Sequence, residues 1–145
     1  MSEVETGCHV KCSCPSFHKP FRRLSLWGGQ FEASPDFVAW DCNCSICHVK
    51  RNVHVIVPRS HFELLEGKDK LTLYQFGTRT AKHYFCSVCG VVSFYVPRSN
   101  PDGYAVTVAC VKPNTIRSIT VNKFDGEHWE EFYGQSGIAA HSKLT

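Results

Sequence analysis

The sequence lacks any apolar run that is long enough to cross a membrane. No run approaches the roughly 18 residues that a spanning helix needs, so we expect no transmembrane segment. The first residues, Met1–Glu5, are acidic and lack the apolar core of a secretory signal peptide. The chain also has no internal repeat, low-complexity tract or linker-like stretch. We therefore expect a single-domain intracellular protein, cytoplasmic and/or nuclear, with no membrane partner.

The even cysteine count that is typical of a disulfide framework is also missing. The chain has 9 cysteines in 145 residues, and an intracellular compartment is reducing. Metal binding explains these thiols better than disulfides do. The formal net charge of +3 counts every thiol as neutral. If seven thiolates held two zinc ions, the net charge would fall to zero, so the basic balance gives no evidence for a nucleic-acid partner.

What the sequence does contain is a dense group of thiols at Cys42, Cys44 and Cys47, a C-x-C-x-x-C arrangement in the stretch Asp41–His48. Thiolates at these spacings can reach one ion from a single tight loop. Zinc is the expected ion, because it accepts sulfur ligands in tetrahedral geometry without redox chemistry. Three protein ligands leave the fourth position free for a substrate, which is typical of a catalytic zinc.

A second group of thiols lies farther along the chain. Cys86 and Cys89 form a C-x-x-C pair followed by Gly90, which suits a tight turn. The spacing permits two pairings. The C-x-x-C pair could join Cys44 and Cys47 in one zinc ribbon, or it could close a four-thiolate site with Cys12 and Cys14, which leaves the three-cysteine group to hold a second zinc.

Short β-branched and apolar runs, separated by Gly, Pro, Asn and Asp, are typical of strands. Only Gly126–Tyr133 has a helical pattern, and it is short. The fold class is therefore mainly β, in one compact zinc-stapled domain over residues 1–135. Residues 15–30 form an atypical insert or loop, and 136–145 form a C-terminal tail. The expected strands are Arg22–Trp27, Phe37–Asp41, Asn52–Val57, Phe62–Leu65, Leu71–Phe76, Lys82–Cys86, Val91–Val96, Tyr104–Val111 and Ile116–Val121.

Three stretches, DCNCSIC, YFCSVCGVVSFY and PRSNPDG, resemble the family of glutathione-dependent formaldehyde-activating enzymes and centromere protein V. The resemblance runs from about Phe31 to Trp129 and is closest to the animal centromere protein V branch. It implies the second pairing, with a structural zinc on Cys12, Cys14, Cys86 and Cys89. It also implies a catalytic zinc, open to a thiol, on Cys42, Cys44 and Cys47.

The N-terminal end departs from the family pattern. Members usually have Gly-Cys-x-Cys-Gly leading directly into a strand, whereas here Gly7-Cys8-His9 precedes the C-x-C pair and Pro15 stands where glycine is expected. Cys8 or His9 could therefore replace Cys12 or Cys14 as a ligand.

A zinc held by three thiolates is a weak Lewis acid, so activation of a thiol suits it better than activation of water. The resemblance implies glutathione as that thiol and formaldehyde as its partner, in a carbon–sulfur lyase reaction written in reverse. Cations should then meet the two carboxylates of glutathione, and Lys50, Arg51, Lys82 and Arg98 are candidates beside the zinc motifs. The alternative function is a non-catalytic zinc protein with a structural or interaction role. Chromatin binding is not expected, because the long N-terminal extension of the animal forms is missing here.

Two further residues have alternative interpretations. Cys110 is either a buried small apolar residue, on a strand face with Val106 and Val108, or a fourth thiol that closes the middle zinc site. His48, directly after Cys47, is either a surface or packing histidine or an acid–base group at that site. The oligomeric state does not follow from the sequence.

Overall fold

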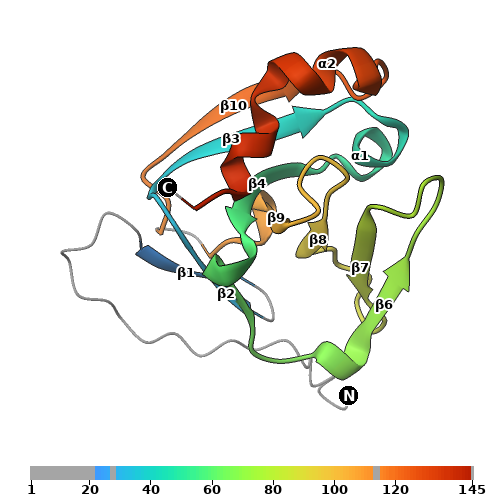
Figure 1. Cartoon of the computed structure of the whole chain (residues 1–145). Coiled ribbons are helices and arrows are strands. Elements are labelled where there is room, and N and C mark those ends of the chain that lie inside the picture. Colours follow the sequence, from blue (N-terminus) through green and yellow to red (C-terminus); the bar gives the residue numbers. More distant parts are fainter. Residues whose placement is uncertain (1–21, 27–28, 113–114, 145) are drawn as a thin grey trace.

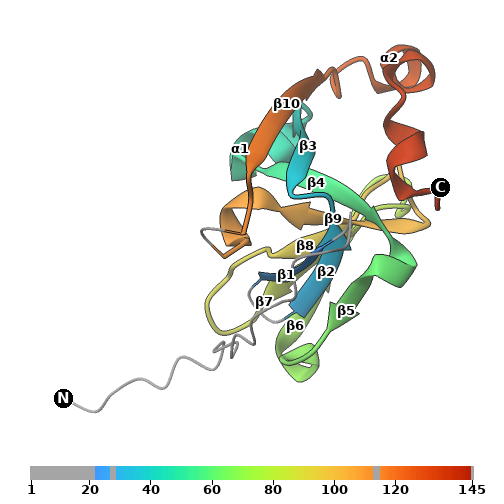
Figure 2. The ribbon, with the colours of Figure 1, turned by 90° about the vertical axis from the view of Figure 1, so that its left-hand side faces the viewer.

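The computed structural model describes residues 22–26, 29–112 and 115–144 (Figure 1). These residues form two sheets with short helices at their edges. The smaller sheet has the strand order β1-β2-β5, and the larger has the order β10-β3-β4-β9-β8-β7-β6. Figure 2 shows β10 and β3 together at one end of the larger sheet, with β6 and β7 toward the other end.

The strands are β1 (Arg22–Leu26), β2 (Gly29–Ala33), β3 (Asp36–Cys42), β4 (Val53–Pro58), β5 (Phe62–Leu64), β6 (Leu71–Tyr74), β7 (Lys82–Cys86), β8 (Phe94–Val96), β9 (Gly103–Thr107) and β10 (Ser118–Phe124). The α-helices are α1 (Ser45–Lys50) and α2 (Trp129–Ser136). Short 3-10 helices are η1 (Arg59–His61), η2 (Lys68–Lys70), η3 (Val108–Cys110) and η4 (Ile138–Ser142). No helix in these described segments is long and apolar enough to cross a bilayer.

Alternation along β4 divides the core into two layers, because successive side chains of a strand point to opposite faces. Val55 and Val57 face the smaller sheet, where a first cluster also contains Phe31, Phe37 and Val106. A strand that is buried on both faces has a nearly continuous apolar sequence, as β4 does.

The opposite face of the larger sheet carries the second core cluster. Its buried members are Trp40, Ile56, Tyr95, Ala105, Phe124 and Ile138. Trp129, Phe132 and Tyr133 of α2 pack against this cluster, so α2 has its apolar side on the sheet. Part of this face stays uncovered between α2 and the β6–β7 end of the sheet, and the cavity described below lies there.

The direction of β10 has a consequence for the site. It pairs with β3 in parallel, whereas the other strand pairs are antiparallel, and it places Phe124 opposite Cys42. A parallel neighbour ends at the same edge of the sheet as its partner. The chain that follows β10 therefore leaves the sheet directly beside the three-cysteine group.

The expected mainly β fold is confirmed, and the expected strands are present, Lys82–Cys86 with the expected bounds and the others with shifted ends. Three local predictions were wrong. Gly29–Ala33 is an additional strand, the three-cysteine stretch contains α1 where a loop was expected, and Cys110 lies in η3 and not on a strand face with Val108. Within the expected tail 136–145, Ile138 of η4 is buried at 2% exposure and belongs to the second core cluster.

Candidate thiolate metal site

The three cysteines converge where β3 passes into α1. Cys42 ends β3, Cys44 is the N-cap of α1, and Cys47 lies one turn into the helix. His48 N–H donates to the Cys44 carbonyl at 2.9 Å, which closes that first turn. The ligand atoms of the three cysteines all lie within 4.8 Å of one another. In the described part of the chain, no other group of three or more His, Cys, Asp or Glu side chains converges in this way.

The chain after β10 holds this loop in place. Asn43 Nδ2 donates to Asp125 Oδ1 at 3.0 Å, and the Asn43 side-chain oxygen accepts from Glu127 N–H at 3.1 Å. Gly126 lies so close that a Cβ there would meet Cys42 Sγ at 2.5 Å and Cys44 Cβ at 2.6 Å. Only glycine fits this contact, since real Cβ atoms do not approach other atoms so closely. The sulfur atoms are therefore positioned by two segments that are about eighty residues apart in sequence.

The electrostatics of the cluster fit a cation. The Cys42 and Cys47 side chains hydrogen-bond to the Cys44 sulfur, and these contacts lower the pKa of Cys44. The same hydrogen bonds, together with burial, raise the pKa of Cys42 and of Cys47. The Cys44 thiol is therefore the one that ionises most readily. Three thiolates at this separation need a soft cation between them, and zinc fits this all-sulfur donor set.

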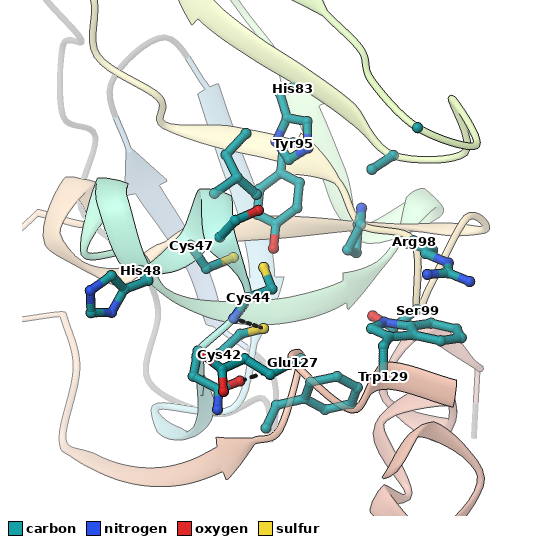
Figure 3. A pocket seen from close by; sticks show the side chains of 18 of the residues that line it. Cys42, Cys44, Cys47, His48, His83, Tyr95, Arg98, Ser99, Glu127 and Trp129 are labelled. Carbon is teal, nitrogen blue, oxygen red and sulfur yellow. Dashed lines mark hydrogen bonds between the residues drawn. The ribbon is translucent and has the colours of Figure 1, made fainter. Parts of the chain in front are cut away.

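A cavity of about 830 Å³ opens beside the cluster (Figure 3). Its wall contains the three cysteines together with residues from β7, β8, the β6–β7 loop, the β8–β9 turn and α2. Arg98 lies over the ring of Trp129 at 3.8 Å and also pairs with Glu130. The guanidinium group is therefore fixed at the cavity wall. Figure 3 shows the sulfur atoms gathered on one side and Arg98 with Trp129 on another.

Tyr95 of β8 reaches into the same cavity. Its hydroxyl oxygen lies 3.4 Å from His54 Nδ1 and 3.3 Å from His54 Nε2. Burial raises the pKa of Tyr95 well above its usual range and lowers the pKa of His54 to about 4. Both groups are therefore neutral near pH 7, and the tyrosine keeps its proton.

His83 of β7 stacks on the Tyr95 ring, with ring centroids 5.1 Å apart. Phe76, from the β6–β7 loop, also stacks on His83, with ring centroids 5.7 Å apart. These rings form the apolar wall of the cavity. The sequence analysis did not identify Tyr95, Phe76 or Trp129 as site residues, because no local motif marks them. The strand register, which places His83 opposite Tyr95, brings the rings of these two residues together.

The other predicted ligands lie elsewhere. Cys86 ends β7, and Cys89 is exposed in the turn that follows, where Gly90 N–H donates to the Cys86 carbonyl at 2.8 Å. Gly90 has φ +75°, which confirms the predicted tight turn. Cys8, His9, Cys12 and Cys14 lie outside the described residues, so the four-thiolate site stays a prediction. Cys110 is buried, and its thiol interacts with Cys89 and not with the three-cysteine cluster.

The predicted cations are distributed around the cluster. Arg98 lines the large cavity. Arg51, which caps α1 with φ +52°, lines a smaller cavity of about 420 Å³ that also touches Cys42 and Cys47. Lys50 interacts electrostatically with Cys47, and His48 lines both cavities. Lys82 is exposed on β7 and lines neither cavity.

Two comparisons with known proteins place this site in context. The sequence model of a family described as glutathione-dependent formaldehyde-activating enzyme matches residues 29–125. A crystal structure of a Rhodobacter sphaeroides protein is similar at 39% sequence identity, with a TM-score of 0.50. That likeness covers 58% of this chain and 80% of the bacterial chain. The family match includes all three cysteines of the cluster, the Cys86–Cys89 pair and Tyr95.

Proposed function

Because this chain belongs to the family of glutathione-dependent formaldehyde-activating enzymes, we propose that it joins a small thiol to formaldehyde at the Cys42, Cys44 and Cys47 site. Glutathione is the proposed thiol. The observation that carries the proposal is the position of the three sulfur atoms in the wall of the large cavity. A purely structural metal would be enclosed by its ligands, whereas this cluster has room beside it for a substrate.

The reaction needs no oxidant and balances by itself. The thiol loses its proton, its sulfur forms a bond to the formaldehyde carbon, and the carbonyl oxygen ends as a hydroxyl group. The product is an S-hydroxymethyl thioether alcohol, and the reverse reaction is that of a carbon–sulfur lyase. A zinc ion bound by the three cysteines would supply acidity toward the incoming thiol, since coordinated thiols are deprotonated at neutral pH.

The other residues of the cavity bind and orient the thiol. Arg98 is the cation of this wall, and its fixed guanidinium group can receive a carboxylate in a two-point contact. Lys50 and Arg51 are weaker candidates, because they lie at the end of α1 outside the large cavity. The stacked rings of Phe76, His83 and Tyr95 exclude water from one side, and holding both reactants in one site supplies the advantage of proximity.

Several finer points belong to the same proposal. A second, structural zinc is proposed on Cys86 and Cys89 together with Cys12 and Cys14. Membership of the animal centromere protein V branch is likewise a proposal, supported by the resemblance of the DCNCSIC, YFCSVCGVVSFY and PRSNPDG stretches. We also propose an intracellular location, cytoplasmic and/or nuclear, because metal ligands of this kind need reduced cysteines, which reducing compartments maintain.

The test is an exchange measurement. Carbon-13 formaldehyde and glutathione form S-hydroxymethylglutathione spontaneously, and NMR exchange spectroscopy gives the rate of interconversion. The protein should raise this rate in proportion to its concentration, and Cys44→Ser should abolish the increase. Cys110→Ser is the matched control, since it removes a buried thiol outside the cluster. An exchange rate that equals the spontaneous one would contradict the proposal and favour the non-catalytic alternative.

A further inference from the structure

Arg98 lies in the turn between β8 and β9, which also carries Ser99 and Asn100. Two backbone hydrogen bonds shape this turn. Asn100 N–H donates to the Pro97 carbonyl at 3.2 Å, and Gly103 N–H donates to the Asn100 carbonyl at 3.0 Å. Arg98 and Ser99 both line the large cavity. The position of the guanidinium group in the cavity therefore depends on what holds the turn.

Asn100 ties the turn to the C-terminal element η4. Its side chain is fully buried, at 0% exposure. The side-chain nitrogen Nδ2 lies 3.0 Å from the Ile138 carbonyl oxygen, 3.3 Å from that of Ala139 and 2.8 Å from Ser142 Oγ. Ser142 Oγ donates in turn to Asp102 Oδ1 at 2.7 Å, near the other end of the turn. A buried amide is costly unless it is hydrogen-bonded, so these contacts hold the turn against η4.

A second contact ties the same turn to α2. The Tyr133 hydroxyl donates to the Ser99 carbonyl at 3.0 Å. Tyr133 also stacks on Trp129, with ring centroids 4.5 Å apart and an interplanar angle of 12°. The Arg98 guanidinium lies over this Trp129 ring at 3.8 Å, and Figure 3 shows Arg98, Ser99 and Trp129 grouped together. Tyr133 therefore contacts both the backbone beside Arg98 and the ring that supports its side chain.

The ion pair between Arg98 and Glu130 does not replace this contact. The Glu130 side chain is 78% exposed, and exposed ion pairs contribute little to holding a side chain in place. Ser99 is only 7% exposed, so the hydrogen bond to its carbonyl is shielded from water. A hydrogen bond is stronger in such a surrounding than at the surface. The Tyr133 hydroxyl is therefore the better anchor between α2 and the turn.

Resting on the proposed function, we propose that Tyr133 is a positioning residue for Arg98, which it orients toward a carboxylate of the thiol substrate. Two-point recognition of a carboxylate depends on the plane of the guanidinium group. Without the Tyr133 hydroxyl, α2 and the turn can shift against each other, and this plane no longer keeps one orientation. Binding of the carboxylate then weakens, whereas the sulfur atoms of the cluster stay where they are.

The experiment measures binding of glutathione to the zinc-loaded full chain by calorimetry, together with the exchange assay. Tyr133→Phe keeps the stacking on Trp129 and removes only the hydroxyl. The dissociation constant and the KM for glutathione should rise about 3- to 10-fold, as expected for the loss of one hydrogen bond, while kcat changes little. Tyr84→Phe is the matched control, because Tyr84 lies on β7, does not line the large cavity and packs its ring against Phe94.

Two readouts separate positioning from a structural role. Cysteamine is a thiol without a carboxylate, so its dissociation constant should be the same in Tyr133→Phe and in the wild type. An Arg98→Gln background has no guanidinium group to position, so Tyr133→Phe should not weaken glutathione binding further in it. If Tyr133→Phe did not fold, Ser142→Ala, which removes the hydroxyl that Asn100 binds, would carry the same test.

An unchanged dissociation constant for glutathione, equal losses for glutathione and cysteamine, or full additivity with Arg98→Gln would overturn the inference. A wild-type chain that binds no glutathione would overturn it as well. A wild-type chain that binds glutathione without raising the exchange rate would instead contradict the proposed function, and the dissociation constants would still decide the inference. The two failures are therefore distinguishable.

Discussion

Gly126 gives the sharpest prediction about how the thiolate cluster is built. An alanine Cβ at this position would lie 2.5 Å from Cys42 Sγ and 2.6 Å from Cys44 Cβ. Relaxing these contacts to an ordinary separation of about 3.5 Å requires a displacement of roughly 1 Å. A metal site tolerates changes in ligand distance of only about 0.2 Å. The alanine variant should therefore displace the sulfur atoms beyond what zinc can accommodate.

Two quantities should change in Gly126→Ala. Overpacking of this kind costs about 1–3 kcal/mol of unfolding free energy, which denaturation of the metal-free protein measures. Zinc retention should fall by more than that cost explains, and competition with a chelator measures it. The enhanced exchange of formaldehyde with glutathione should disappear together with the metal.

Gly134→Ala is the matched control for this variant. Gly134 lies within α2, and a Cβ there meets nothing within 4 Å. Alanine should stabilise the helix by up to about 1 kcal/mol and leave the affinity for zinc unchanged. If Gly126→Ala bound zinc as tightly as the Gly134→Ala control, the segment after β10 would not support the cluster, and the reasoning would be refuted.

Three further predictions concern other parts of the fold. Cys44→Ser should abolish thiol uptake but lose less unfolding free energy than Cys86→Ser, because metal at a structural site contributes directly to folding. Equal losses in denaturation curves would contradict the assignment of Cys44 to a catalytic site and Cys86 to a structural one. Arg98→Lys should keep the charge but lose the stacking over Trp129. The KM for glutathione should therefore rise severalfold while kcat changes little. An unchanged KM would exclude a contact between Arg98 and a carboxylate of glutathione. Hydrogen bonds from Lys143 and Ser142 lower the pKa of Asp102, so its contribution to stability is present above the ordinary carboxyl range and is lost as the pH falls through the lowered pKa. Asp102→Asn should therefore flatten the acid limb of the stability curve, and an unchanged limb would show that this contact is not formed in solution.

Much of the sheet could be predicted from local sequence, because buried strands are apolar and turns are rich in Gly, Pro, Asn and Asp. The run Val53–Val57 illustrates this, since both of its faces are buried. The strand Gly29–Ala33 was not predicted, because its first residue extends a Gly-Gly turn signal and only two of its residues, Phe31 and Ala33, have apolar side chains. The helix α1 was not predicted, because the spacing of the three cysteines was taken to indicate a metal-binding loop.

The site was only partly accessible from the sequence. The spacing of Cys42, Cys44 and Cys47 was sufficient to predict their convergence, which the structure confirms. Gly126 and Tyr95 could not be assigned to the site, because the first depends on β10 running parallel to β3 and the second on the register of β7 with β8. Neither the order of strands nor their register follows from the composition of any single segment.

The three thiols come from one short segment, and they line a cavity. A metal bound by them would therefore leave room for a substrate on the cavity side. Tyr95 and His54 lie on the sheet side of the cluster, Gly126 lies on the β10 side, and Arg98 stands at the cavity wall. Each group acts on a different part of the reaction site, so their variants should give separable effects.

The most direct test of the central claim is the zinc-edge X-ray absorption spectrum of the purified protein, with its metal content, before and after addition of glutathione. We predict that zinc held by Cys42, Cys44 and Cys47 gains one sulfur neighbour when glutathione is added, and that Cys44→Ser shows no such gain. Zinc whose coordination stays the same after addition of glutathione would show a closed site and would contradict a thiol-activating function.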